Sequence, residues 1–203
     1  MAMTYLHAVA SLDGYIADER DQVGPLHDWY FKGEHPLVED DHAEVHGGAP
    51  FRVSAASAEY VRGMWSRQKV LVIGRHQFDL TNGWEGHPPA SDYVVVVSHR
   101  PKPTDWHPDA PYHFATSVKE GIARAQELAG EGEIAVGAGD VGGQALSLGL
   151  IDHVAIDIVP VVFGRGKPYF GTLTNGHVML EDPEVVIQGA GVLHLRYAVR
   201  RPR

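Results

Sequence analysis

Short apolar runs, separated by polar and glycine-rich stretches, set the pattern of predicted elements along this chain. Runs of four to eight apolar residues bounded by turn signals are typical of buried strands. The last two of these runs flank a Gly-Ala-Gly sequence at 189–191 and predict a hairpin. The predicted strands cover residues 6–10, 70–73, 93–97, 112–115, 134–136, 153–159, 178–180, 184–188 and 192–199.

Capping residues mark the predicted helices between these strands. Residues 54–65 predict a helix with Ser54 as its N-cap. Residues 118–129 predict a second helix, with Thr116 or Ser117 as its cap and a glycine at its end. A further helix is predicted over 143–149.

The alternation of strands and helices predicts an α/β fold with a mostly parallel central sheet flanked by helices. The closing hairpin predicts an antiparallel edge. Residues 18–53 show no strand or helix period and predict a long functional loop or lid. No linker divides the sequence, so we expect residues 1–203 to form a single domain.

Composition adds limits on the kind of protein. Of the 203 residues, 44% are apolar and 21% are charged, which is ordinary for a globular domain. No apolar run approaches the length of a membrane span, and the first residues lack a signal-like pattern, so we expect a cytoplasmic protein without membrane contact. The net charge of −9 argues against nucleic acid as a partner.

A metal site is considered and set aside. The chain has no cysteine, which excludes thiolate ligands and disulfides. Among its 13 histidines, His42 and His46 are four residues apart within an acidic stretch, where a weak metal site is conceivable. The alternative, a solvated acidic loop, is favoured because a third defined ligand is lacking.

A glycine turn carries the clearest chemical signal. Residues 137–142 read Gly-Ala-Gly-Asp-Val-Gly and stand between a predicted strand and a predicted helix. Such a corner binds phosphate, because glycines allow close approach and the helix N-terminus presents unbonded N–H groups. Asp157 follows the first glycine by 20 residues, where a dinucleotide-binding fingerprint has its ribose-binding acid. By itself this spacing predicts a Rossmann domain that uses NADH.

Four segments in order point elsewhere. Residues 8–17 (AVASLDGYIA), 72–78 (VIGRHQF), 136–142 (VGAGDVG) and 148–170 resemble the dihydrofolate-reductase-like superfamily, and within it the riboflavin-biosynthesis reductases. The resemblance implies that the pyrophosphate of NADPH lies on the glycine turn, through Gly137, Gly139, Asp140, Val141 and Gly142. Asp157 then leaves the site and becomes a polar residue on the less buried sheet face or at a subunit contact.

The resemblance also assigns the rest of the cofactor site. It implies that residues after two strand ends contact the 2′-phosphate and the adenosine: Gly74, Arg75 and His76 after one strand, and Ser98, His99 and Arg100 after another. Arginine offers a bidentate fork and serine a neutral donor. The alternative for each arginine is an ordinary exposed strand end.

Candidate catalytic residues lie near the first predicted strand. Ala8 and Ala10 are small enough to let a nicotinamide ring approach the sheet. Asp13 and Tyr15 in the following turn could orient or protonate a substrate, although Asp-Gly is also a common turn pair. Glu59 is a further candidate acid, since folate-reducing relatives carry an acid on the helix before the Gly-Arg strand.

Aromatic residues are candidates for substrate contact. Trp29, Tyr30 and Phe31 could stack on a planar heterocycle, or they could anchor the loop to the core. Phe163 is expected to flank the nicotinamide. The acidic character of 34–44 argues against a phosphorylated ribityl substrate.

The resulting expectation is an NADPH-dependent reductase that acts on a small heterocyclic, carbonyl or imine substrate. The alternatives are a pyrimidinone reductase of a riboflavin-like pathway and a non-catalytic NADP(H)-binding regulatory module. A homodimer is predicted, with Val154–Val159 and the apolar segment Pro160–Phe163 pairing across a two-fold axis.

Overall fold

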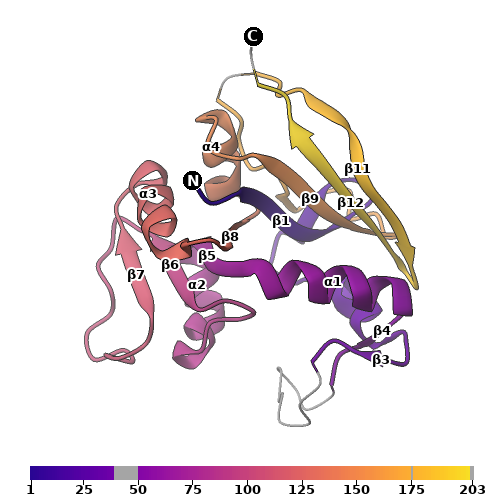
Figure 1. The fold of residues 1–203 in the computed structure, drawn as a ribbon, viewed down its shortest axis with the longest axis horizontal. Coiled ribbons are helices and arrows are strands. Elements are labelled where there is room, and N and C mark those ends of the chain that lie inside the picture. The colour runs from indigo at the N-terminus through magenta and orange to yellow at the C-terminus, as the bar shows by residue number, and fades with distance from the viewer. Residues whose placement is uncertain (39–49, 175, 202–203) are drawn as a thin grey trace.

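The computed structural model describes residues 1–38, 50–174 and 176–201, which form an eight-stranded sheet with helices on both faces (Figure 1). The strand order is β11-β12-β9-β1-β8-β5-β6-β7. Neighbours from β9 to β7 are all parallel, and the β11–β12 hairpin adds to β9 in antiparallel orientation. This confirms the predicted fold class. The strands are β1 (Thr4–Ser11), β5 (Gln68–Gly74), β6 (Tyr93–Val97), β7 (Tyr112–Ala115), β8 (Glu133–Gly137), β9 (His153–Val159), β11 (Leu180–Gly189) and β12 (Val192–Val199).

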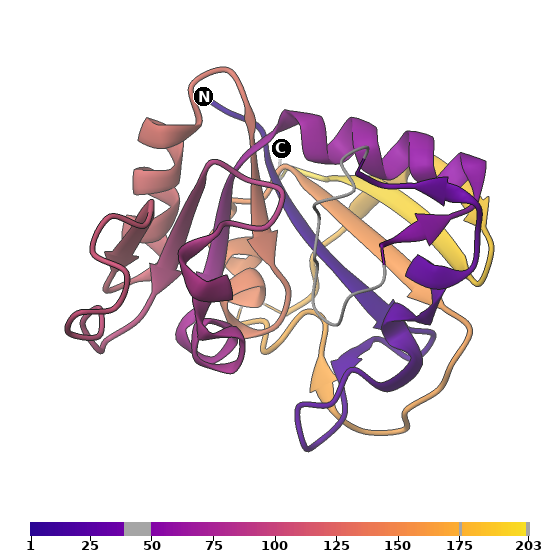
Figure 2. The ribbon, with the colours of Figure 1, turned by 90° about the horizontal axis from the view of Figure 1, so that it is seen from below.

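Helices cover the two faces of the sheet with different partners. On one face, α3 and α4 pack on the alternate strand residues Leu6, Val72 and Val136. On the other face, α1 packs on β1, β9 and β12, and α2 packs on β5 and β6 (Figure 2). The helices are α1 (Ala55–Arg67), α2 (Arg75–Thr81), α3 (Val118–Ala129) and α4 (Asp140–Ser147).

Short elements complete the described chain. Two 3₁₀ helices are present, and two pairs of very short strands lie outside the main sheet. They are η1 (Gly24–Phe31), η2 (Asn82–Gly86), β2 (Tyr15–Ala17) with β10 (Lys167–Pro168), and β3 (His35–Pro36) with β4 (Arg52–Val53).

The predicted caps are present at both long helices. The Ser54 side chain accepts a hydrogen bond from the N–H of Ser57, and Ser117 accepts one from the N–H of Glu120. Of the two caps considered for α3, the structure uses Ser117, while the Glu120 carboxylate reaches back to the N–H of Thr116. The arrangement resembles a capping box, except that the glutamate bonds the residue before the N-cap rather than the N-cap itself.

Four parts of the fold differ from the prediction, and one of them is α2, which the sequence analysis did not predict. The helix predicted over 143–149 spans 140–147, so it begins inside the glycine turn. The predicted strands at 178–180 and 184–188 are one bulged strand, β11, with Pro183 at a register shift. The segment 18–53 is not structureless, because η1, β3 and β4 lie within its described part.

The predicted dimer contact through β9 is wrong. β9 pairs with β1 on one side and with β12 on the other, so neither of its edges is free for a second chain. Asp157, in the middle of β9, is 1% exposed rather than on a less buried face. In the described part of the chain, the strands at the two edges of the sheet are β11 and β7.

No helix among the residues described here combines the length and the apolar character needed to cross a lipid bilayer.

Candidate functional site

The carboxyl ends of four parallel strands bring the predicted cofactor residues to one edge of the sheet. β1 ends at Ser11, β5 at Gly74, β6 just before Ser98, and β8 at Gly137. These strands are neighbours in the order β1-β8-β5-β6. In open α/β sheets, ligands bind outside the carboxyl ends of the strands.

The glycine turn between β8 and α4 is built by backbone constraints. Gly139 has a φ of 92°, which is the left-handed side favoured by glycine, and its N–H donates to the carbonyl of Tyr169 at 2.7 Å. A side chain at Gly142 would collide with Leu6 of β1. The Gly139 N–H is therefore used within the protein. The N–H groups of Asp140, Val141 and Gly142, in the first turn of α4, have no partner within that helix.

The starts of α2 and α4 lie against each other. A Cβ at Gly74, which precedes α2, would lie 3.1 Å from Val141 Cγ2, so the missing side chain permits this contact. In the same region, Gln77 Oε1 of α2 lies 3.0 Å from the position of a Cβ at Gly137. The glycine turn and the Gly-Arg corner are thus one contiguous surface.

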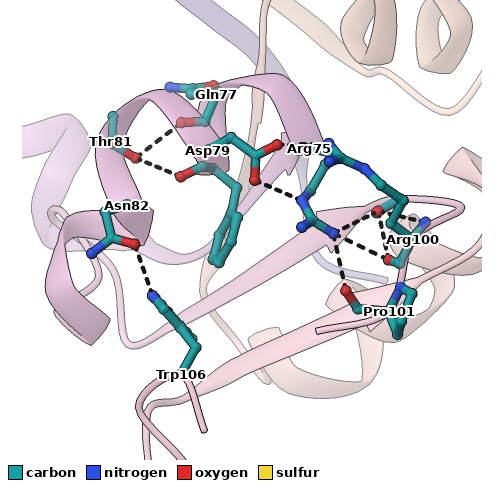
Figure 3. Close-up of polar contacts among 10 residues, drawn as sticks. Arg75, Gln77, Asp79, Thr81, Asn82, Arg100, Pro101 and Trp106 are labelled. Carbon is teal, nitrogen blue, oxygen red and sulfur yellow. Dashed lines mark hydrogen bonds and ion pairs between the residues drawn. The ribbon is translucent and has the colours of Figure 1, made fainter. Parts of the chain in front are cut away.

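Arg75 and Arg100 are joined by an acid that the sequence analysis did not include (Figure 3). Arg75 Nε is 2.7 Å from Asp79 Oδ1, and Arg100 Nη2 is 2.6 Å from Asp79 Oδ2. The hydrogen bond from Arg75 is the largest cause that lowers the pKa of Asp79; burial opposes it, and the hydrogen bond from Arg100 and the charges of both arginines add to the lowering. Two guanidinium groups and one carboxylate leave this cluster with a net positive charge.

The loop after β6 is shaped by Ser98. Its hydroxyl donates to the Arg100 carbonyl at 2.6 Å and accepts from the Arg100 N–H at 2.9 Å. Arg75 Nη1 also bonds the Pro101 carbonyl at 3.0 Å, which fixes the guanidinium against this loop (Figure 3). His99 is exposed.

His76 points to a different part of the molecule from Arg75. Its Nε2 lies 2.9 Å from Asp21 Oδ1, and Asp21 also lies 3.5 Å from Lys167 Nζ. The structure therefore brings Gly74, Arg75, Ser98 and Arg100 together but directs His76 toward the segment after β2.

Asp13 holds two loops together. Its carboxylate accepts from the Ser11 hydroxyl at 2.6 Å, from the Phe163 N–H at 3.1 Å and from the Gly164 N–H at 2.7 Å. The Ser11 hydrogen bond, together with the two backbone donors, outweighs a burial effect and lowers the pKa of Asp13. A carboxylate held ionised by three donors is suited to positioning the 160–166 segment and poorly suited to donating a proton.

The other catalytic candidates are dispersed. Tyr15 is half-buried on β2, opposite Pro168 of β10. Ala10 is fully buried against the α3–α4 face, whereas Ala8 is partly exposed. Glu59 lies on the exposed side of α1, and no contact within the described residues connects it to Asp13.

The aromatic residues of η1 pack inward. Trp29 is 1% exposed, stacks on Tyr30 with ring centroids 4.0 Å apart, and meets His194 edge-on at 5.2 Å. This placement favours the anchoring alternative for Trp29. Phe31 is 51% exposed, and Phe163 is half-buried at the edge of the same cluster. Phe163 also borders a surface hollow whose other lining residues are Asp18, Glu19, Arg20 and Arg165.

Sequence reasoning missed a buried chain of hydrogen bonds. Asp157 Oδ2 is 3.1 Å from His7 Nε2, and Asp157 Oδ1 is 2.6 Å from His194 Nδ1. His194 Nε2 is in turn 2.9 Å from the hydroxyl of Ser57 on α1. Ser57, Asp157 and His194 are each at most 1% exposed. Single polar residues inside apolar strands, as at Leu-His-Ala and Ile-Asp-Ile, were the available signal.

The metal candidates His42 and His46 lie outside the described residues. Within the described ranges, no group of three or more histidine, aspartate or glutamate side chains is arranged to hold a metal ion.

The comparisons with known proteins show the fold. No protein-family model matches the sequence, and no curated protein matches it at a significant level. Among solved structures, one of a protein assigned to riboflavin biosynthesis from Shewanella sp. PV-4 is similar with a TM-score of 0.65 and 24% sequence identity. The alignment covers 99% of this chain and 100% of that one.

Two longer proteins share the same architecture. A diaminohydroxyphosphoribosylaminopyrimidine deaminase/5-amino-6-(5-phosphoribosylamino)uracil reductase from Thermotoga maritima has a TM-score of 0.60 at 13% identity, and RibD from Acinetobacter baumannii has 0.56 at 12%. Each alignment covers 98% of this chain, but only 57% and 58% of those proteins. The chain thus has the fold of these riboflavin biosynthesis proteins, as its four sequence segments predicted.

Proposed function

We propose that this protein is an NADPH-dependent reductase that delivers a hydride to the C=N or C=O group of a small heterocyclic or carbonyl substrate. One observation carries the proposal: the unbonded N–H groups at the start of α4 lie beside a positively charged cluster at the ends of β5 and β6. A dinucleotide with an additional phosphate needs both features, one for its pyrophosphate and one for its 2′-phosphate.

The described residues fit the two phosphate groups of NADPH. The N–H groups of Asp140, Val141 and Gly142 would hold the pyrophosphate through the backbone, since the Asp140 carboxylate is itself negative. Arg75 and Arg100 would hold the 2′-phosphate. Asp79 keeps both guanidinium groups in place at 2.7 and 2.6 Å before any ligand arrives.

A second candidate is reduction of a pyrimidinone in a riboflavin-like pathway. It is supported by the structural similarity to the Thermotoga protein, whose name includes a uracil reductase activity. The chain aligns with 57% of that protein, so the activity of the whole relative does not transfer to it. The non-catalytic NADP(H)-binding module is the third candidate, and the experiments below separate it from an enzyme.

Titration with NADPH and NADH tests the cofactor site. Arg75→Ala and Arg100→Ala each remove a charge-assisted contact, so each should weaken NADPH binding by about 10- to 100-fold, equivalent to roughly 1.5–3 kcal/mol, and leave NADH binding nearly unchanged. Arg124→Ala is the matched control, because Arg124 is a half-buried arginine on α3 whose partners are Glu127 and His113, away from the glycine turn. Absence of binding by either nucleotide would overturn the proposal.

Acceptor screening then tests catalysis. Cyclic imines, aldehydes and pyrimidinones are offered with NADPH, and oxidation of the cofactor is followed by loss of its absorbance. Turnover of a pyrimidinone in preference to the others would support the second candidate. Tight NADPH binding without oxidation by any acceptor class would support the non-catalytic module.

We also propose that the protein is a homodimer, although not through β9. Leu12 and Val162 are 65% and 67% exposed, and the backbone at Leu12 bonds Val161 at 2.8 Å, so these apolar side chains belong to one surface. The edge strand β11 also exposes Val186. A cytoplasmic location remains a prediction from the sequence.

A further inference from the structure

His7 is the open end of the buried hydrogen-bond chain. The side chain of His7 is 17% exposed, against 1% for Asp157 and 0% for His194. With Nε2 bonded to Asp157, the second ring nitrogen is Nδ1. No described residue bonds Nδ1, and Nδ1 is absent from the buried, unpartnered polar atoms of the described chain. Nδ1 is therefore the ring nitrogen of His7 that no described residue occupies.

This ring nitrogen of His7 lies beside the proposed cofactor surface. His7 of β1 pairs with Gly137 of β8 in the parallel register, and paired residues of neighbouring strands face the same side of the sheet. On that side, the Gln77 side chain of α2 covers Gly137. His7 is therefore one strand away from the first glycine of the turn, on the face that carries α2 and Arg75.

The other residues of the hydrogen-bond chain determine which ring nitrogen of His7 carries the proton when the ring is neutral. A chain in which Ser54 donates to Ser57, Ser57 to His194 Nε2, and His194 Nδ1 to Asp157 satisfies every polar atom. Asp157 then accepts from His7 Nε2–H, which leaves Nδ1 as the atom that gains and loses a proton. This arrangement has the residue types of a hydrolytic triad, but the enclosed Ser57 hydroxyl is not accessible to a substrate.

We propose that His7 is the proton donor of the reductase, with Asp157 and His194 as positioning residues. This inference rests on the proposed function, and it supplies the group that neither Asp13 nor Glu59 provides in this structure. An imidazole backed by a carboxylate is a common general acid, because the carboxylate orients the ring and stabilises its charged form.

The proposed reduction uses a hydride from NADPH and a proton from His7. When bound, NADPH supplies a hydride, a hydrogen with its electron pair, and is oxidised to NADP⁺. The substrate carbon gains this hydrogen as the π bond of its C=N or C=O group breaks. The nitrogen or oxygen takes the proton from His7 Nδ1, which completes the reduction to an amine or an alcohol. The neutral imidazole then regains a proton from water.

The tyrosines around the His7–Asp157 pair keep their protons at neutral pH. Within the described part of the chain, four tyrosines, an arginine and His194 surround the His7–Asp157 pair. Gln77 of α2 covers the neighbouring Gly137. Burial raises the pKa of each tyrosine, that of Tyr60 to about 12, so these hydroxyls remain neutral between pH 5 and 9. The tyrosines are Tyr5, Tyr30, Tyr60 and Tyr169, and the arginine is Arg196.

Nitrogen-15 NMR of the imidazole rings of the whole protein tests the placement of His7, with NADP⁺ and NADPH as probes and His7→Gln for assignment. The Nε2–H form of His7 is expected in the neutral state. Binding of NADP⁺ or NADPH should shift the ring-nitrogen resonances of His7, because the nicotinamide would lie beside its exposed edge. His153 is the matched reference, because it is also 17% exposed and lies 3.3 Å from a carboxylate, that of Glu184. The His153 resonances should not shift on nucleotide binding.

Kinetics of any acceptor found in the screen test the chemical role. His7→Gln should lower kcat by about 10²- to 10⁴-fold with NADPH affinity retained, and should abolish the fall of kcat on the alkaline side of the pH profile. Asp157→Asn should shift that fall to lower pH, which a purely structural loss of active protein would not do. His153→Gln should behave as the wild type.

The outcomes separate the two proposals. If neither nucleotide binds, both the reductase proposal and the role of His7 are wrong. If NADPH binds but the His7 resonances do not respond to it, only the role of His7 is wrong. Retention of full kcat and an unchanged pH profile in His7→Gln would also overturn it.

Discussion

Asp157 links two strands of the protein interior through buried hydrogen bonds. Each of its oxygens is bonded to a histidine ring, and the two rings belong to different strands, β1 and β12. Burial opposes ionisation, but the charge of His7 and the hydrogen bonds from both histidines outweigh it and lower the pKa of Asp157 to about 2.

This pKa predicts acid sensitivity with a defined sign. Because the folded pKa lies below the ordinary 3.8, ionised Asp157 stabilises the fold above about pH 4, and this contribution is lost as the pH falls toward 2. A lowering of about two pKa units corresponds to roughly 2–3 kcal/mol. Urea unfolding should show Asp157→Asn to be less stable by about 3–5 kcal/mol at pH 6, with a smaller difference near pH 2.

The control is Asp92→Asn, since Asp92 is 57% exposed in its pair with Lys69. Exposed pairs contribute less than about 1 kcal/mol, so little change is expected at either pH. A cost for Asp157→Asn that is the same at both pH values would contradict the assigned source of stability.

At the level of elements, glycines inside helices have opposite roles in α1 and α4. Gly142 of α4 faces Leu6 of β1 and the Gly137 carbonyl so closely that no side chain fits. Gly63 of α1 has only the flexible Arg67 guanidinium nearby, 3.6 Å from its Cβ position. The first glycine is required by packing, whereas the second only weakens its helix.

Paired substitutions test this difference. Gly142→Ala should destabilise the protein by about 1–3 kcal/mol, because a methyl group must be forced between α4 and the sheet. Gly63→Ala should stabilise it by about 0.5–1 kcal/mol through helix propensity. Thermal unfolding of the two variants beside the wild type gives both signs, and stabilisation by both alanines would contradict the close contact at Gly142.

The elements that could be predicted are those with a strong local signal. The strands at 70–73 and 93–97 have uninterrupted apolar runs, and α1 and α3 have capping serines. The helix α2 has neither, because it is seven residues long, has no side-chain cap and buries only Phe78. It forms because it follows β5 directly and packs Phe78 against β5 and β6.

The candidate site also has features that the sequence predicts and features that only the structure shows. Strand ends place Arg75 and Ser98 near each other, and this proximity follows from the order of parallel strands. The bridging role of Asp79 and the chain from Ser57 to His7 depend on side chains meeting across distant segments. No spacing along the sequence reports such a meeting, so they were found only in the structure.

At the scale of the whole molecule, the protein is negative overall but has a locally positive cluster at the proposed nucleotide site. The chain carries −9 overall, yet Arg75 and Arg100 outnumber Asp79 at the edge where a nucleotide is proposed to bind. A local positive site within a negative protein attracts a polyanion only at short range, because salt screens the remainder beyond about 10 Å.

The proposed homodimer is also a property of the whole molecule. Size-exclusion chromatography with light scattering should give twice the 22.2 kDa mass of the chain. If the apolar surface at Leu12 and Val162 forms the contact, Val162→Asp should yield a monomer, whereas Val186→Asp on β11 should not. A monomeric wild type at micromolar concentration would contradict the dimer.

The position of β1 has a consequence for how the chain reaches its fold. Thr4 pairs with Ile134 of β8 and Tyr5 with His153 of β9, so the N-terminal strand lies between two strands made much later. During synthesis, β1 emerges well before β8 and β9 and remains without either neighbour until they have been made. Non-local pairing of this kind slows folding. The central strand is therefore among the last to be secured, and the early chain presents an unpaired apolar strand that chaperones would be expected to protect.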